Sequence, residues 1–99
     1  MDKSEIKDKL VQSSSQIFFN ELKIDILKDV IILVSPDLIL IDVAESCALD
    51  DQHLFQNWVN KGLIKKPRQI EIDYWKKENT SFNCCIVKPF IFIQKASLN

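Results

Sequence analysis

The sequence predicts a single α+β domain over residues 1–99, in which about four helices pack on a small antiparallel sheet of about three strands. Two observations support this prediction. Apolar residues recur at helical spacing in several segments, and two apolar runs, 30–34 and 82–94, are typical of buried strands. With 99 residues, 46% of them hydrophobic and 27% charged, the chain has the length and composition of one globular domain.

The N-terminal part is expected to form two helices. Asp2 and Glu5 match a capping box, and the apolar spacing after them predicts a helix over residues 3–12. Ser14 or Ser15 can cap a second helix, because apolar residues then recur every four positions. This stripe consists of Phe18, Leu22 and Ile26.

The next segments predict a strand followed by a helix. Residues 30–34 are all apolar, and four of the five are β-branched, which indicates a buried strand. The following Ser35-Pro36-Asp37 is either a turn before a second strand over 38–41 or the start of a helix capped by Ser35. The helix is favoured because one apolar face continues beyond the run. That face consists of Leu40, Ala44 and Cys47.

A further helix and a short strand are expected after the acidic pair Asp50-Asp51, either of which can cap the helix. The apolar face of this helix consists of Leu54, Phe55, Trp58 and Val59. Gly62 stands where a helix C-terminus favours a left-handed residue. Residues 63–66 then predict a short strand, and residues 68–78 fit either a strand or a helix.

The segment Phe82–Gln94 predicts one long strand, with Pro89 marking a bulge or an edge. Both of its faces are apolar, so the strand must be covered twice, by helices of the same chain or by a partner subunit. This makes it a candidate strand for a homodimer. The residues proposed for that interface are Phe82, Cys84, Ile86, Phe90 and Phe92.

The order of several landmarks resembles a known family. The landmarks are Phe19-Asn20-Glu21-Leu22, the strand over 30–34, Leu38-Ile39-Leu40-Ile41-Asp42-Val43-Ala44, Asp50-Asp51, Trp58-Val59, Gly62-Leu63, Trp75 and Val87–Gln94. Together they resemble the small bacterial family of domains of unknown function numbered 2288, over nearly the whole chain. The resemblance implies a cytoplasmic one-domain protein, assigns no activity, and favours a helix over residues 68–78.

Residues 40–66 indicate an alternative, nucleic-acid binding. A helix, an acidic turn, a second helix, Gly62 and a basic strand follow one another as in a winged helix. Residues 61–77 carry six basic and two acidic side chains, whereas residues 1–60 carry five basic and eleven acidic ones. Few cations lie on the second helix itself, and phosphate contacts supply most of the affinity for nucleic acid. The candidate surface consists of Gln52, His53, Gln56, Asn57, Lys61, Lys65, Lys66 and Arg68.

The sequence holds no recognisable catalytic, metal or nucleotide motif. Adjacent Cys84 and Cys85 point to opposite faces of a strand, so they are expected to be buried free thiols rather than zinc ligands with Cys47 and His53. His53 is expected on the surface. Five carboxylates can bind a divalent cation or act as acid and base, but such groups more often cap helices and face solvent. They are Asp37, Asp42, Glu45, Asp50 and Asp51.

These observations predict a non-catalytic protein-interaction or regulatory module that can form a homodimer. The alternatives are a winged-helix-like nucleic-acid-binding protein and, last, a small enzyme that uses the acidic cluster. No cofactor is expected. The apolar runs are too short to span a bilayer and the N-terminus has no signal-peptide pattern, so a cytoplasmic protein without membrane association is expected.

Overall fold

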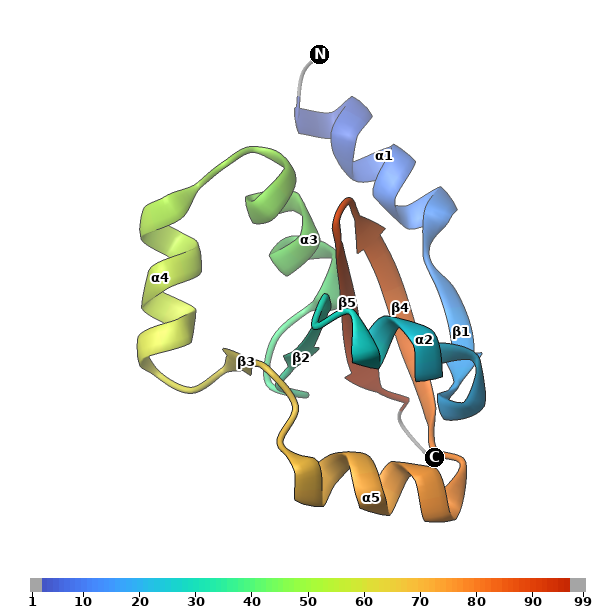
Figure 1. The fold of residues 1–99 in the computed structure, drawn as a ribbon. Coiled ribbons are helices and arrows are strands. Elements are labelled where there is room, and N and C mark those ends of the chain that lie inside the picture. Colours follow the sequence, from blue (N-terminus) through green and yellow to red (C-terminus); the bar gives the residue numbers. More distant parts are fainter. Residues whose placement is uncertain (1–2, 97–99) are drawn as a thin grey trace.

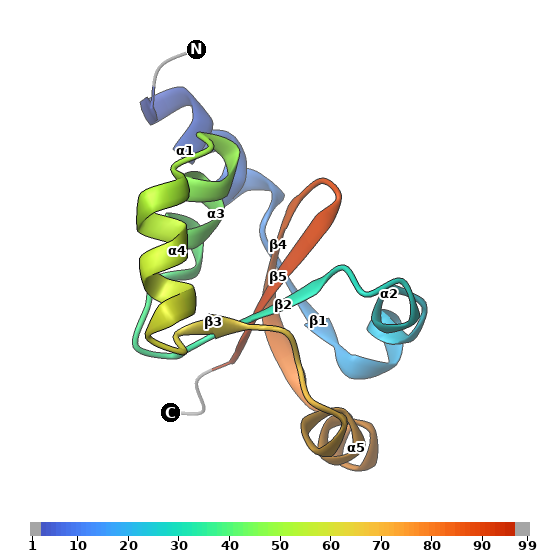
Figure 2. The ribbon, with the colours of Figure 1, turned by 60° about the vertical axis from the view of Figure 1, so that its left-hand side comes forward.

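The computed structural model describes residues 3–96 and has three layers, a five-stranded sheet with helices on both faces (Figures 1 and 2). In chain order the elements are α1 (Lys3–Ser13), β1 (Ser15–Phe18), the 3₁₀ helix η1 (Phe19–Leu22), α2 (Lys23–Leu27), β2 (Ile31–Val34), α3 (Leu40–Ala48), α4 (Gln52–Asn60), β3 (Ile64–Lys65), α5 (Gln69–Glu78), β4 (Ser81–Val87) and β5 (Phe90–Lys95). The chain is therefore α+β, as predicted, but with more helices and strands than expected.

The sheet is mixed, with the strand order β1-β4-β5-β2-β3. Neighbouring strands are antiparallel except β2 and β5, which run parallel and pair Ile32 with Phe92. The sheet therefore differs in detail from the prediction of about three antiparallel strands, because it has five strands and one parallel pair. The winged-helix-like arrangement is not confirmed. The strand β5, which lies between β4 and β2, is at the centre of the sheet.

The single long strand expected over Phe82–Gln94 is wrong. The chain reverses at Lys88-Pro89, and β4 and β5 form an antiparallel hairpin in which Val87 pairs with Phe90. Proline has no N–H and a fixed φ, so it suits a turn better than the interior of a strand ladder. The reversal places Cys85 and Phe92 on one face of the sheet and Cys84 and Ile93 on the other.

The helices α1, α3 and α4 cover one face of the sheet (Figure 2). Their core consists of Leu10, Val34, Leu40, Val43, Ala44, Ile64, Cys85 and Phe92. The helix α3 begins at Leu40, later than a cap at Ser35 would place it. The side-chain amide of Gln94 donates to the carbonyl oxygens of Ser35 and Leu38, at 2.8 and 2.6 Å, and so holds these residues in a turn.

The helices η1, α2 and α5 cover the opposite face (Figure 2). The indole of Trp75 on α5 packs between Phe82, with ring centroids 5.0 Å apart, and Phe19, at 6.4 Å. This contact explains why residues 69–78 form the helix that the family resemblance favoured. The core on this face consists of Phe19, Leu22, Ile31, Trp75, Phe82 and Ile93.

The first helix is confirmed as α1, although its proposed cap Asp2 lies outside the described residues. The second helix, expected from Ser14 or Ser15, is wrong in its first half. Residues 15–18 form β1 instead, because they pair along the edge of β4, and only a short helix, α2, follows η1. Sequence spacing does not reveal such a long-range strand pairing.

Left-handed residues end several of the helices. Gly62 has φ +72°, as expected, and follows α4. The other left-handed residues are Asp29, Asp50 and Asn79. After α3, the N–H of Asp51 donates to the carbonyl oxygen of Ser46 at 2.8 Å, which closes the helix end around Asp50. None of the helices in residues 3–96 is long and apolar enough to cross a membrane.

Candidate functional site

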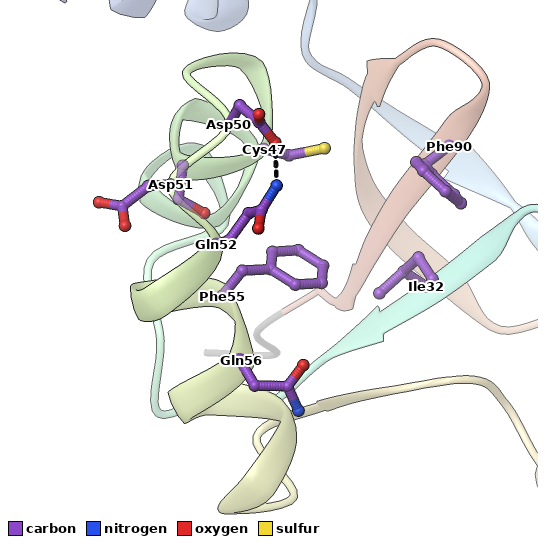
Figure 3. Close-up of a pocket in the computed structure, with 9 residues that line it drawn as sticks. Ile32, Cys47, Asp50, Asp51, Gln52, Phe55, Gln56 and Phe90 are labelled. Carbon is purple, nitrogen blue, oxygen red and sulfur yellow. Dashed lines mark hydrogen bonds between the residues drawn. The ribbon is translucent and has the colours of Figure 1, made fainter.

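An open cleft of about 330 Å³ lies between the start of α4 and the sheet (Figure 3). Four side chains from four elements form its apolar surface. They are Ile32 of β2, Cys47 of α3, Phe55 of α4 and Phe90 of β5. In Figure 3 the Phe55 ring and the Cys47 sulfur extend from the helices toward Ile32 and Phe90 on the strands.

The apolar surface continues a group of three aromatic rings. Phe92, fully buried on β5, contacts Phe55 with ring centroids 6.3 Å apart and Phe90 with centroids 6.5 Å apart. Phe90 itself keeps 38% of its surface exposed, and Phe55 is half-buried. The cleft therefore leaves accessible apolar surface next to the buried core.

The rim of the cleft is polar and acidic. It consists of Asp50, Asp51, Gln52 and Gln56, together with the buried Ser46. Asp51 caps α4, as one of the two expected residues, because its Oδ1 accepts the N–H of Leu54 at 3.2 Å. Asp50 Oδ1 accepts the side-chain amide of Gln52 at 3.4 Å. Both aspartates are exposed, and the lining includes no lysine or arginine.

Cys47 contributes an apolar wall rather than a reactive thiolate. Burial raises the pKa of this thiol above its ordinary value, and the charge of Asp50 raises it further. The thiol therefore stays protonated at neutral pH, where it is a weak nucleophile. All three cysteines are free, and Cys84 and Cys85 are buried, as predicted.

The predicted nucleic-acid surface is divided between an exposed helix face and a set of paired cations. Four of its residues lie on the exposed side of α4 and line a shallow groove there. They are Gln52, His53, Gln56 and Asn57. Lys61 follows the helix and is also exposed.

The other three cations of that surface form ion pairs within the chain. Lys65 Nζ lies 3.5 Å from Glu71 Oε2, and Arg68 Nε lies 3.3 Å from Glu71 Oε1. Lys66 Nζ lies 2.6 Å from Asp29 Oδ2. Phosphate binding would have to compete with these carboxylates.

The candidate dimer strand lies mostly inside the chain. Phe82, Cys84 and Phe92 are buried, and both β4 and β5 have hydrogen-bonded neighbours on each side. Helices of the same chain cover both apolar faces of these strands. Of the five residues proposed, Ile86 is 48% exposed and Phe90 38% exposed.

The five carboxylates of the acidic cluster do not come together as one site. Asp42 and Glu45 on α3 line a narrow groove with Asp51, whereas Asp37 lies in the turn before α3. Asp42 Oδ1 is 3.2 Å from Lys7 Nζ, and this hydrogen bond raises the pKa of the lysine. Within residues 3–96, no three histidine, cysteine or acidic side chains are placed to hold a metal ion.

Most of the cleft was not predicted from the sequence. Cys47 and Phe55 were expected only as parts of apolar helix faces, and Ile32 only as part of a strand. No local signal identifies these residues, because the cleft forms where α4 stands away from the sheet. This position of α4, which has no fully buried residue, is set by packing between segments that are distant in the sequence.

Comparisons with known proteins indicate a family and a fold. A family model described as "Protein of unknown function (DUF2288)" matches residues 5–95. The fold is similar to the NMR solution structure of PA1075 from Pseudomonas aeruginosa, with a TM-score of 0.80, 24% sequence identity and coverage of 97% of this chain and 93% of that chain. No curated protein matches the sequence. At this identity the structural likeness describes the fold alone.

Proposed function

The chain belongs to the DUF2288 family of proteins of unknown function, and from its own geometry we propose that it is a non-catalytic protein-interaction module. Its cleft binds an apolar side chain of a partner protein. The observation that carries this proposal is the cleft of about 330 Å³ in which Phe55 and Phe90 remain accessible. Covering such apolar surface on binding is favourable, and the volume lies within the range of about 300–1,000 Å³ typical of binding pockets.

The chemistry of the lining favours binding over catalysis. A covalent mechanism needs an activated nucleophile with a base in reach. The thiol of Cys47 has a raised pKa. The hydroxyl of Ser46 donates to the carbonyl oxygen of Val43 at 2.8 Å and is buried. The acidic-cluster enzyme is the least supported alternative, because its five carboxylates do not come together as one site.

Nucleic-acid binding remains the second candidate because α4 exposes a polar face. Amide side chains such as Gln56 and Asn57 are suited to base edges. The ion pairs of Lys65, Lys66 and Arg68 and the aspartates before α4 weaken this candidate. It predicts that a mixed-sequence DNA duplex binds at low salt and that salt weakens the binding. Binding that salt leaves unchanged, or no binding, excludes it.

The interaction proposal is tested by NMR titration of the isotope-labelled protein with two small probes. N-acetyl-phenylalaninamide presents an apolar side chain, and N-acetyl-glutaminamide is its polar match. We expect the first probe alone to shift the amide signals of Cys47, Phe55 and Phe90. Equal shifts with both probes, or shifts confined to α2 and α5, would contradict the proposal.

Two variants sharpen this test. Cys47→Leu adds apolar bulk inside the cleft and should abolish the shifts, while His53→Leu adds the same side chain on the exposed side of α4 and should leave them unchanged. The dispersion of the remaining signals shows whether each variant keeps the fold. Equal loss of binding in both variants would argue against the cleft as the site.

A further inference from the structure

We infer that the partner segment is cationic, with lysine or arginine on either side of the apolar residue that enters the cleft. This inference rests on the proposed function and adds the chemistry of the partner. It starts from the distribution of charge around the cleft. Residues 30–60, which include β2, α3 and α4, contain five carboxylates and no lysine or arginine.

The aspartates at the rim differ from the acidic residues Asp29, Asp42 and Glu71, each of which has a cation beside it. Asp42 is paired with Lys7, and Glu71 with both Lys65 and Arg68. Among the described residues, no ion pair includes Asp50 or Asp51. Lys7, Lys65, Lys66 and Arg68 are thus paired with carboxylates of the same chain, whereas Asp50 and Asp51 beside the cleft are available to a partner.

The two rim carboxylates are also held in place. Asp50 and Asp51 donate their backbone N–H groups to Cys47 and Ser46, at 3.1 and 2.8 Å. Asp51 uses Oδ1 to cap α4, which leaves Oδ2 for another donor. A cation beside the apolar residue of a partner would therefore meet carboxylates that need little further ordering, which lowers the cost of binding.

Charge also argues against other occupants of the cleft. A second copy of the chain presents the same acidic rim, and like charges at an interface are unfavourable. Half of the cations in its basic segment 61–77, namely Lys65, Lys66 and Arg68, are already held in ion pairs, which leaves Lys61, Lys76 and Lys77. Nucleic acids and anionic membranes are repelled by the rim. A cationic peptide segment satisfies both the apolar surface and the aspartates.

Three peptides that differ only in charge test the inference. They are acetyl-Lys-Lys-Phe-Lys-Lys-amide and its counterparts with glutamine or glutamate in place of lysine. By NMR titration, we expect the lysine peptide to bind about three- to tenfold more tightly than the glutamine peptide at low salt. The glutamate peptide should bind most weakly. The advantage of lysine should shrink between about 20 and about 300 mM NaCl.

A double variant assigns the effect to the rim. Asp50→Asn with Asp51→Asn removes both charges, while asparagine still tolerates the left-handed conformation and still caps a helix. In this variant the lysine peptide should bind no better than the glutamine peptide, whose own affinity should not change. Asp37→Asn, which removes an exposed charge outside the cleft, is the matched control and should preserve the advantage.

The outcomes separate the two proposals. If the lysine and glutamine peptides bind the cleft equally, the cationic partner is excluded and the interaction module stands. If no peptide shifts Cys47, Phe55 or Phe90, both proposals are overturned. If the double variant keeps the advantage of lysine, the cations bind elsewhere and the rim has no such role.

Discussion

The rings of Phe55 and Phe92 meet edge to face, with centroids 6.3 Å apart and an interplanar angle of 75°. Phe92 lies at the centre of the sheet and is fully buried, while Phe55 is half-buried on α4. No residue of α4 is fully buried, so Phe55 and Trp58 are the main apolar residues by which this helix packs on the core. The width of the cleft therefore depends on this pair of rings.

Replacing Phe55 should destabilise the protein and loosen α4. We expect Phe55→Ala to lower the free energy of unfolding by about 2 kcal/mol, less than for a fully buried phenylalanine because the ring is half-exposed. Phe55→Leu should cost about half as much. Urea denaturation measures both. Leu54→Ala, at an exposed neighbouring position, serves as a control with an expected cost near 0.5 kcal/mol. Equal costs at both positions would show that the ring contact does not hold the helix.

The effect of a substitution at Asp50 on stability should depend on how well the new residue tolerates the left-handed backbone there, which has φ 56°. Asp50→Ala should lower the free energy of unfolding by about 1 kcal/mol, because a side chain without a polar group disfavours this conformation. Asp50→Gly and Asp50→Asn should match or slightly exceed the original stability. Thermal unfolding ranks the three variants. If alanine were as stable as glycine there, the backbone at this corner would not be under strain.

Because of Glu71, the free energy of unfolding should decrease at acid pH. Burial alone would raise the pKa of this carboxyl, but the backbone N–H and side chain of Arg68 and the charge of Lys65 outweigh burial and lower it. A folded-state pKa below the unfolded value means that the ionised group stabilises the fold at neutral pH. This stabilisation is lost as the pH falls through the folded-state pKa.

The variant Glu71→Gln tests this dependence. Its free energy of unfolding at pH 7 should be about 1 kcal/mol lower than that of the original protein. The reason is that the N-terminus of α5 loses a charged acceptor, since Glu71 Oε1 accepts the backbone N–H of Arg68 at 3.0 Å in the original protein. The difference from the original protein should narrow when urea denaturation is repeated near pH 3. Asp73→Asn, at an exposed position of the same helix, should show little difference at either pH. A constant difference across this range would contradict the role of the charge.

Cys84 should make the stability fall at alkaline pH. Burial, followed by the nearby Cys85 and Asp25, raises the pKa of this thiol from 9.0 to about 11. Because the folded-state pKa is the higher one, the unfolded chain loses its proton first, and stability decreases as the pH rises from 9 toward 11. Cys84→Ala should be less stable at pH 8 but should lose less on further alkalinisation. Parallel curves of unfolding free energy against pH for the two proteins would contradict this.

Local patterns predicted the elements whose signals lie within the element itself. The β-branched run over residues 30–34, the cap at Asp51 and the left-handed Gly62 each have a short-range cause, and each occurs as expected. The left-handed Asp29, Asp50 and Asn79 were not predicted, because these residue types only tolerate that conformation and do not require it.

The errors concern contacts between distant segments. Residues 15–18 fit a helical stripe, but pairing with Ser81–Cys84 makes them a strand. Pro89 was expected to mark a bulge or an edge in one strand, whereas it turns the chain between two strands that pair with each other. The cleft depends on the same long-range packing, so its residues were predicted as apolar but not as neighbours.

The parallel pairing of β2 with β5 has a consequence for how the chain folds. Ile32 pairs with Phe92, sixty positions later, so the centre of the sheet closes only after a long loop has formed. During synthesis, β2 and α3 lack their packing partners in β4 and β5 until that hairpin has left the ribosome. Folding should therefore be slow for a chain of this size, and the nascent protein should need protection from aggregation until that hairpin inserts.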